Sequence, residues 1–148
     1  MNNDITFNSE EAMLAFGSSL ANYLNLGNVM YLEGELGSGK TTIARGILRG
    51  FGYTGNVPSP TYTLIETYNL PVAFIVHADL YRINNFQDIE GIGFRDYFEK
   101  KAIVIVEWAD KFNSELPPPD LRLSLHSAEE GRIVRIEEGK LDILNLCK

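Results

Sequence analysis

The residues with the clearest chemical potential lie in one short segment, residues 34–41, which reads Gly-Glu-Leu-Gly-Ser-Gly-Lys-Thr. It matches G-x-x-x-x-G-K-(S/T) at every fixed position. Its glycines permit backbone conformations that turn N–H groups onto phosphate oxygens, and a following helix points its positive dipole end at the same anion. Lys40 is placed to reach the β- and γ-phosphates, and the Thr41 hydroxyl to join a magnesium shell. The segment therefore predicts a nucleotide-binding loop. The residues expected to contact the nucleotide here are Gly37, Ser38, Gly39, Lys40, Thr41 and Thr42.

A loop of this kind needs an acidic group on a neighbouring strand, which holds magnesium and orients the nucleophile. Asp79 and Glu107 each follow an apolar run typical of a buried strand. Ligands of open α/β sheets bind at the carboxyl ends of such strands. Each acid can also be read as a solvated residue where its strand emerges, and the sequence leaves open which acid is nearer the metal. His77 and Trp108, which lie beside them, are ambiguous between packing and chemistry.

A scaffold must position these residues, and the sequence predicts a scaffold in which strands and helices alternate. Strands are expected over residues 5–7, 29–32, 62–68, 72–76, 102–106, 121–126 and 132–138. Helices are expected after a cap at Asn8, over residues 41–51, and in one or two short pieces within 85–98. The interpretation is a P-loop NTPase-like, three-layer α/β sandwich with a mostly parallel central sheet and antiparallel edge strands.

Length and charge limit the possible functions. The chain has 148 residues, which suits one compact domain over residues 1–148. Its 13 basic and 20 acidic residues give a net charge of −7, and no basic stripe is present, which argues against direct binding of nucleic acid. A single cysteine, Cys147, excludes an intramolecular disulfide. With no secretion signal and no apolar run of roughly 20 residues, the chain is expected to be cytoplasmic and not membrane-bound.

Four further segments follow the phosphate loop in a specific order. They are residues 55–64, which contain Ser-Pro-Thr-Tyr, residues 77–82 (His-Ala-Asp-Leu-Tyr-Arg), residues 93–98, and residues 106–108 (Val-Glu-Trp). Together with the loop, they resemble the TsaE (formerly YjeE) family, small P-loop ATPases of bacterial tRNA threonylcarbamoyladenosine synthesis. The resemblance runs from about residue 10 to residue 136, nearly the whole chain.

The resemblance implies an ATPase that hydrolyses ATP weakly alone and acts with two partner proteins, TsaD and TsaB. TsaD places the threonylcarbamoyl group on adenosine of tRNA, TsaB is its non-catalytic partner, and hydrolysis by the TsaE-type subunit resets their complex between turnovers. The cofactors implied are ATP and Mg²⁺, and tRNA is expected to be met only through the complex.

Residue roles also follow from the resemblance. Lys40 would contact phosphate, Thr41 and Glu107 would hold magnesium, and Asp79 would be needed for hydrolysis. The segment over residues 59–61 would resemble the switch of a GTPase. Three residues would lie near the adenine and ribose: Glu10, Gly131 and Arg132.

Two functions from other classes remain open at this point. One is a small-molecule kinase, although the dispersed Lys and Arg residues offer no arginine-rich lid. The other is a nucleotide-dependent regulatory module that acts without meaningful hydrolysis. Arg82 and Arg95 are internal candidates for stabilising transition-state charge, and each is equally readable as a surface ion-pair residue.

Overall fold

The computed structural model describes residues 4–139 of the chain, so Cys147 lies outside the described part. Its strands are β1 (Asp4–Phe7), β2 (Val29–Gly34), β3 (Ile65–Asn69), β4 (Phe74–Asp79), β5 (Ile103–Glu107), β6 (Leu121–Ser127) and β7 (Arg132–Gly139). Its helices are α1 (Glu10–Leu20), α2 (Lys40–Gly50), α3 (Gln87–Glu90), α4 (Phe94–Glu99) and the short 3₁₀ helix η1 (Ala109–Phe112).

The strands form one sheet in the order β1-β7-β6-β2-β5-β4-β3. The four central strands, β6, β2, β5 and β4, pair in parallel. The edges are antiparallel: β7 and β1 extend one side, and β3 pairs with β4 on the other. This confirms the predicted fold class, including the terminal hairpin of β6 and β7. No helix within residues 4–139 has the length and apolar character needed to span a bilayer.

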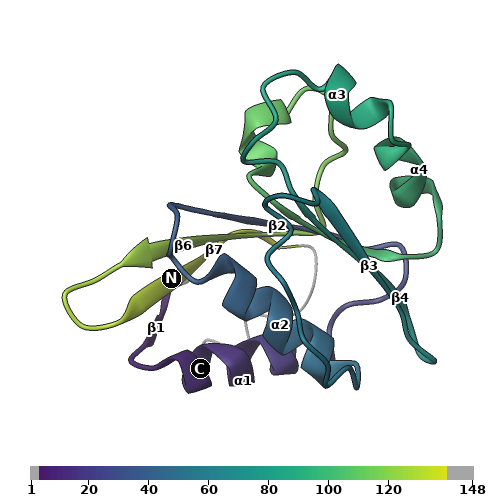
Figure 1. The fold of residues 1–148 in the computed structure, drawn as a ribbon. Coiled ribbons are helices and arrows are strands. Elements are labelled where there is room, and N and C mark those ends of the chain that lie inside the picture. Colours follow the sequence, from purple (N-terminus) through teal and green to yellow (C-terminus); the bar gives the residue numbers. More distant parts are fainter. Residues whose placement is uncertain (1–3, 140–148) are drawn as a thin grey trace.

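Helices cover both faces of the sheet, with α1 and α2 on one side and α3 and α4 on the other (Figure 1). Two separate cores result, because successive residues of each strand point to opposite faces. The core under α1 and α2 contains, among others, Met30, Leu32, Ile43, Ile47, Ile75, Ile103 and Ile105. The core on the other face contains, among others, Tyr31, Val76, Ala78, Ile89, Phe94, Val104 and Val106.

The first helix begins one residue later than the predicted cap implies. Ser9, not Asn8, is the N-cap: its backbone is extended and its hydroxyl accepts a hydrogen bond from the N–H of Ala12, with an N···O distance of 3.1 Å. Serine and asparagine cap helices about equally well, so composition alone did not distinguish the two positions. Asn8 instead lines a cavity that also contains Glu10.

The predicted strand over residues 62–68 is also displaced, since β3 spans Ile65–Asn69. The residues before it form a turn, closed by a 2.7 Å hydrogen bond from the N–H of Leu64 to the carbonyl of Pro60. Leu64 has a positive φ of 70°, which ends any extended run there. Its carbonyl accepts a 2.9 Å bond from the N–H of Asp79, so the turn is fixed to the end of β4.

Candidate functional site

The predicted phosphate loop connects β2 to α2, since the strand ends at Gly34 and the helix begins at Lys40. Gly39 is the N-cap of α2 and has a φ of 109°, in the region that favours glycine. A Cβ atom there would also lie 2.4 Å from Cε of Met13, so α1 packs directly against the loop. The loop therefore requires glycine at this position because of its backbone conformation, whereas the end of the flexible Met13 side chain can shift away from an added Cβ atom.

Lys40 is held across the loop by the loop's own carbonyls. The residue is 5% exposed, and Nζ donates to the carbonyl oxygens of Gly34 at 2.6 Å and Glu35 at 2.9 Å. Nζ also lies 4.7 Å from the centre of the Trp108 ring. Burial lowers the pKa of Lys40, and the nearby carboxylate of Glu107 opposes that shift. The ammonium group is thus held beside the loop by neutral acceptors. A phosphate anion in their place would form stronger, charge-assisted bonds.

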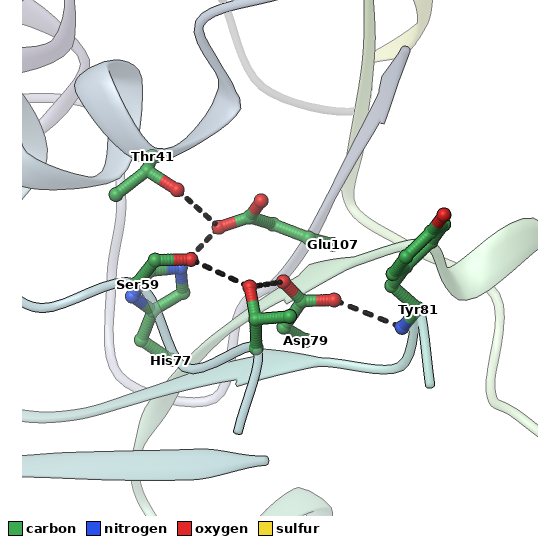
Figure 2. Close-up of polar contacts among 7 residues, drawn as sticks. Thr41, Ser59, His77, Asp79, Tyr81 and Glu107 are labelled. Carbon is green, nitrogen blue, oxygen red and sulfur yellow. Dashed lines mark hydrogen bonds and ion pairs between the residues drawn. The ribbon is translucent and has the colours of Figure 1, made fainter. Parts of the chain in front are cut away.

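Thr41, in the first turn of α2, is hydrogen-bonded to Glu107, the last residue of β5. Its Oγ1 donates to Oε2 of the carboxylate at 3.2 Å (Figure 2). Glu107 is 3% exposed. Because the threonine oxygen is the donor, its lone pairs remain available to a cation. The predicted pair of metal-binding residues is therefore adjacent.

These oxygen donors fit magnesium, which usually takes one or two carboxylates and completes its shell with phosphate oxygens and water. Within residues 4–139, no group of three His, Cys, Asp or Glu side chains is placed to hold a metal ion. The chemistry of the donor set therefore suits a cation that arrives with its nucleotide. It does not suit a cation held by protein side chains alone.

Asp79, the last residue of β4, is fixed by two donors. Thr61 Oγ1 donates to its Oδ2 at 3.0 Å, and the N–H of Tyr81 donates to Oδ1 at 2.9 Å (Figure 2). Ser59 Oγ lies 2.9 Å from Oγ1 of Thr61 and extends this chain of hydroxyls. Burial raises the pKa of Asp79, and the hydrogen bonds from Tyr81 and Thr61 counteract part of that rise.

A cavity of about 250 Å³ brings these groups together. Its lining residues come from the phosphate loop, the two strand ends and the Ser-Pro-Thr segment: Leu36, Gly37, Gly39, Lys40, Thr41, Thr42, Ser59, Thr61, Asp79, Glu107 and Trp108. A basic group, several hydroxyl-bearing residues and two carboxylates thus line one space beside the N-terminus of α2. Such a space suits a phosphate chain with a bound cation.

A second cavity of about 340 Å³ adjoins the first, because Gly37, Gly39 and Thr42 line both. It contains the three residues predicted to lie near adenine and ribose: Glu10, Gly131 and Arg132. The first of them is paired with Arg45 at 3.2 Å. Nη2 of Arg132 donates to the carbonyl of Gly37 at 3.3 Å, which joins the last hairpin to the phosphate loop.

Some predicted residues lie elsewhere. Ser38 lines neither cavity: its buried hydroxyl has no hydrogen-bond partner among the described protein atoms, and its backbone N–H donates to the carbonyl of Glu35 at 3.1 Å. Arg95 forms an ion pair with Glu90, and Arg82 stacks on the Tyr62 ring at 4.1 Å. Neither arginine lines the cavity beside the phosphate loop.

The sequence also left one contact unrecognised. His77 Nε2 lies 2.6 Å from Oε2 of Glu107, and the imidazole is fully buried (Figure 2). The available signal was a polar residue two positions after Ile75, in the apolar alternation of a buried strand.

Comparison with known proteins supports the resemblance drawn from the motifs. Residues 7–134 match the family model described as "Threonylcarbamoyl adenosine biosynthesis protein TsaE". A tRNA threonylcarbamoyladenosine biosynthesis protein TsaE from Haemophilus influenzae is 40% identical over 132 residues, covering 86% of this chain and 84% of that protein. The protein of that name from Bacillus subtilis is 37% identical over 123 residues, covering 83% and 76%.

A solved structure gives the same result for the fold. The crystal structure of YdiB from Bacillus subtilis superimposes with a TM-score of 0.75 and 29% identity, covering 92% of this chain and 86% of that one. The similarity therefore extends over most of the fold.

Proposed function

This chain belongs to the TsaE family of threonylcarbamoyl adenosine biosynthesis proteins, and we propose that its part in tRNA threonylcarbamoyladenosine modification is to bind and hydrolyse ATP with Mg²⁺. The observation that carries this proposal is the grouping of Lys40, Thr41, Asp79 and Glu107 around one cavity beside the phosphate loop. Each of the four comes from the end of a different strand or the start of a helix, and each has an acid, base or ligand function that ATP hydrolysis needs.

In this mechanism, the backbone N–H groups of residues 37–42 and the Lys40 ammonium bind the phosphates. Thr41 and Glu107 supply oxygen ligands for magnesium, which when bound neutralises charge on the phosphate oxygens. The ionised Asp79 carboxylate orients the attacking water and accepts its proton. Glu10, Gly131 and Arg132 bind the nucleoside end in the adjoining cavity.

The segment over residues 59–61 acts as the switch. Thr61 donates to Asp79, and Ser59 continues the chain of hydroxyls toward the phosphate cavity that both residues line. A change in the occupant of that cavity therefore alters the partners of these hydroxyls directly. Order–disorder changes of such segments are a common way for nucleotide state to reach a partner protein.

The partners proposed are TsaD and TsaB, with hydrolysis resetting their complex between turnovers and tRNA held by the complex. Among residues 4–139, no arginine lines the cavity beside the phosphate loop. An arginine supplied by a second protein increases turnover by roughly 10³- to 10⁵-fold in related reactions, which would account for the weak activity expected of the chain alone. The proposal includes a cytoplasmic location and a single ATPase domain over residues 1–148.

Reconstitution tests this function. Purified chain, ATP, Mg²⁺, TsaD, TsaB and substrate tRNA are combined, and modified adenosines per TsaD molecule are counted. Repeated turnovers are expected only with the chain present, and unchanged turnover in its absence would remove the functional proposal. Phosphate release without any added acceptor separates an ATPase from a small-molecule kinase. Loss of complementation by Asp79→Asn excludes a regulatory module that does not need hydrolysis.

A further inference from the structure

His77 occupies a position at which the fold otherwise places apolar residues. It lies on β4 between Ile75 and Asp79 on the face covered by α1 and α2, and it is paired in register with Ile105 of β5. Its side chain is 0% exposed. Burying a polar ring there costs free energy unless its nitrogens are hydrogen-bonded.

Only one of the two ring nitrogens has a hydrogen-bond partner within residues 4–139. Nε2 lies 2.6 Å from Glu107 Oε2, whereas Nδ1 has no hydrogen-bond partner among the described protein atoms. A carboxylate oxygen accepts, so Nε2 carries the proton of this bond. The opposite tautomer would set two lone pairs against each other and bury an unpaired N–H. The burial of this ring is thus compensated only through Glu107.

The bond has a directional consequence for the carboxylate. Thr41 and His77 both donate to Oε2. Oε1 therefore has no hydrogen-bond partner among residues 4–139. Two donors on one oxygen fix the rotation of the carboxylate and leave the other oxygen available.

We propose that His77 is a positioning residue for the magnesium site: its Nε2–H holds Oε2 of Glu107 so that Oε1 faces the cation or one of its waters. The proposal rests on the proposed function, since it presupposes that Glu107 serves magnesium. A hydrogen-bond donor behind a ligating carboxylate typically changes metal affinity by about 10- to 100-fold. His77 touches neither nucleotide nor metal in this arrangement, because the carboxylate lies between.

The test compares two amides of different length at this position in the full chain. The amide nitrogen in His77→Gln extends close to the place of Nε2, whereas that in His77→Asn stops near the place of Nδ1. ADP affinity is measured by calorimetry in EDTA and again across a magnesium titration, with thermal melting of each variant. Glu107→Gln gives the response of a site without its carboxylate. Ile105→Val, which trims the residue paired with His77, controls for general loosening of this core.

His77→Asn is expected to raise the magnesium concentration at half-maximal tightening by about 10-fold or more, with ADP affinity in EDTA within about twofold of wild type. His77→Gln and Ile105→Val are expected to stay close to wild type. His77→Leu suits the apolar surroundings and serves the same comparison if His77→Asn does not fold.

Two kinds of result would overturn the proposal. One rejects only the positioning role of His77, and the other also rejects the proposed magnesium site. An unchanged magnesium response in His77→Asn, or an equal loss of ADP affinity with and without magnesium, rejects the positioning role alone. A wild-type chain that binds ADP identically in EDTA and in magnesium rejects the proposed magnesium site itself.

Discussion

Asp79 lies directly opposite Glu107 in the register between β4 and β5, yet the two carboxylates are held by different donors. Asp79 accepts from the Thr61 hydroxyl and the N–H of Tyr81. Glu107 accepts from the Thr41 hydroxyl at the start of α2 and from His77. The first acid is connected to the Ser-Pro-Thr segment and the second to the phosphate loop, so we expect their substitutions to have different effects.

Asp79→Asn and Glu107→Gln should separate hydrolysis from magnesium binding. Asp79→Asn removes the base and is expected to lower ATP turnover by about 10²- to 10⁴-fold while magnesium-dependent nucleotide binding is kept. Glu107→Gln removes a cation ligand and is expected to lose both turnover and the magnesium dependence of binding. Phosphate release and calorimetry with and without magnesium measure the difference.

Both variants should fail to complement loss of the gene in cells while still binding nucleotide. Growth supported by either one would show that hydrolysis is dispensable. Identical binding profiles for the two would contradict the separate roles.

The pH dependence of hydrolysis should depend on Thr61. Burial raises the pKa of Asp79 above its ordinary value of 3.8, and turnover requires the ionised carboxylate, so the rate should fall as pH drops through this raised pKa. The Thr61 hydrogen bond lowers the pKa. Thr61→Val should therefore move the acidic limb of the kcat profile to higher pH.

Thr63 supplies the matched control for that measurement. It lies in the same segment, but its hydroxyl donates to Glu66 at 2.9 Å and not to Asp79. Thr63→Val is expected to leave the acidic limb in place. A shift of equal size in both variants would indicate a general disturbance of the segment.

Lys40→Ala should weaken nucleotide binding as well as turnover. A charge-assisted hydrogen bond is worth about 1.5–3 kcal/mol, which corresponds to an affinity loss of roughly 10- to 100-fold. ATP titration by calorimetry measures it, with the exposed Lys101→Ala as the control for loss of one positive charge. Normal ATP affinity in Lys40→Ala would count against the phosphate-loop assignment.

Gly131→Ala tests the turn that carries Arg132 to the second cavity. Gly131 has a φ of 94°, and a Cβ atom there would lie 2.0 Å from the carbonyl oxygen of Phe7. Gly27 has a nearly identical φ of 95° with nothing within 4 Å, so Gly27→Ala pays only the conformational cost of about 1–2 kcal/mol.

We expect Gly131→Ala to lose a further 1–3 kcal/mol or so from overpacking, and to bind ATP more weakly than Gly27→Ala does. Thermal melting and calorimetry of the pair measure both effects. Equal melting temperatures for the two variants would contradict the close contact between Gly131 and Phe7.

The central strands could be predicted from the sequence because their burial is recorded in their composition. β2 and β5 are covered by helices on both faces, so they read as nearly continuous apolar runs and were found within one or two residues. β3 is an edge strand, and threonine and tyrosine occur both in it and in the turn that precedes it. In that turn, Thr61 and Thr63 donate hydrogen bonds to carboxylates. Composition alone does not distinguish such a turn from a strand.

The site was predictable where its residues are close in sequence, and less so where it depends on strand pairing. The phosphate loop is contiguous, so its pattern identified Lys40 and Thr41 directly. The contact of His77 with Glu107 joins residues that are 30 positions apart on different strands. It requires the parallel register of β4 and β5, which no local pattern contains.

The two cores, one on each face of the sheet, also fix the positions of Asp79 and Glu107. Val76 and Ala78 belong to the core under α3 and α4, while Ile75 belongs to the opposite core. If β4 slipped by one residue against β5, every side chain of β4 would change face. Asp79 would then lie among apolar residues, and Ile75 would lose its apolar neighbours. Any such misalignment would therefore disrupt the packing of both cores at once. Apolar residues far from the ligand thus fix the spacing of the two carboxylates beside it.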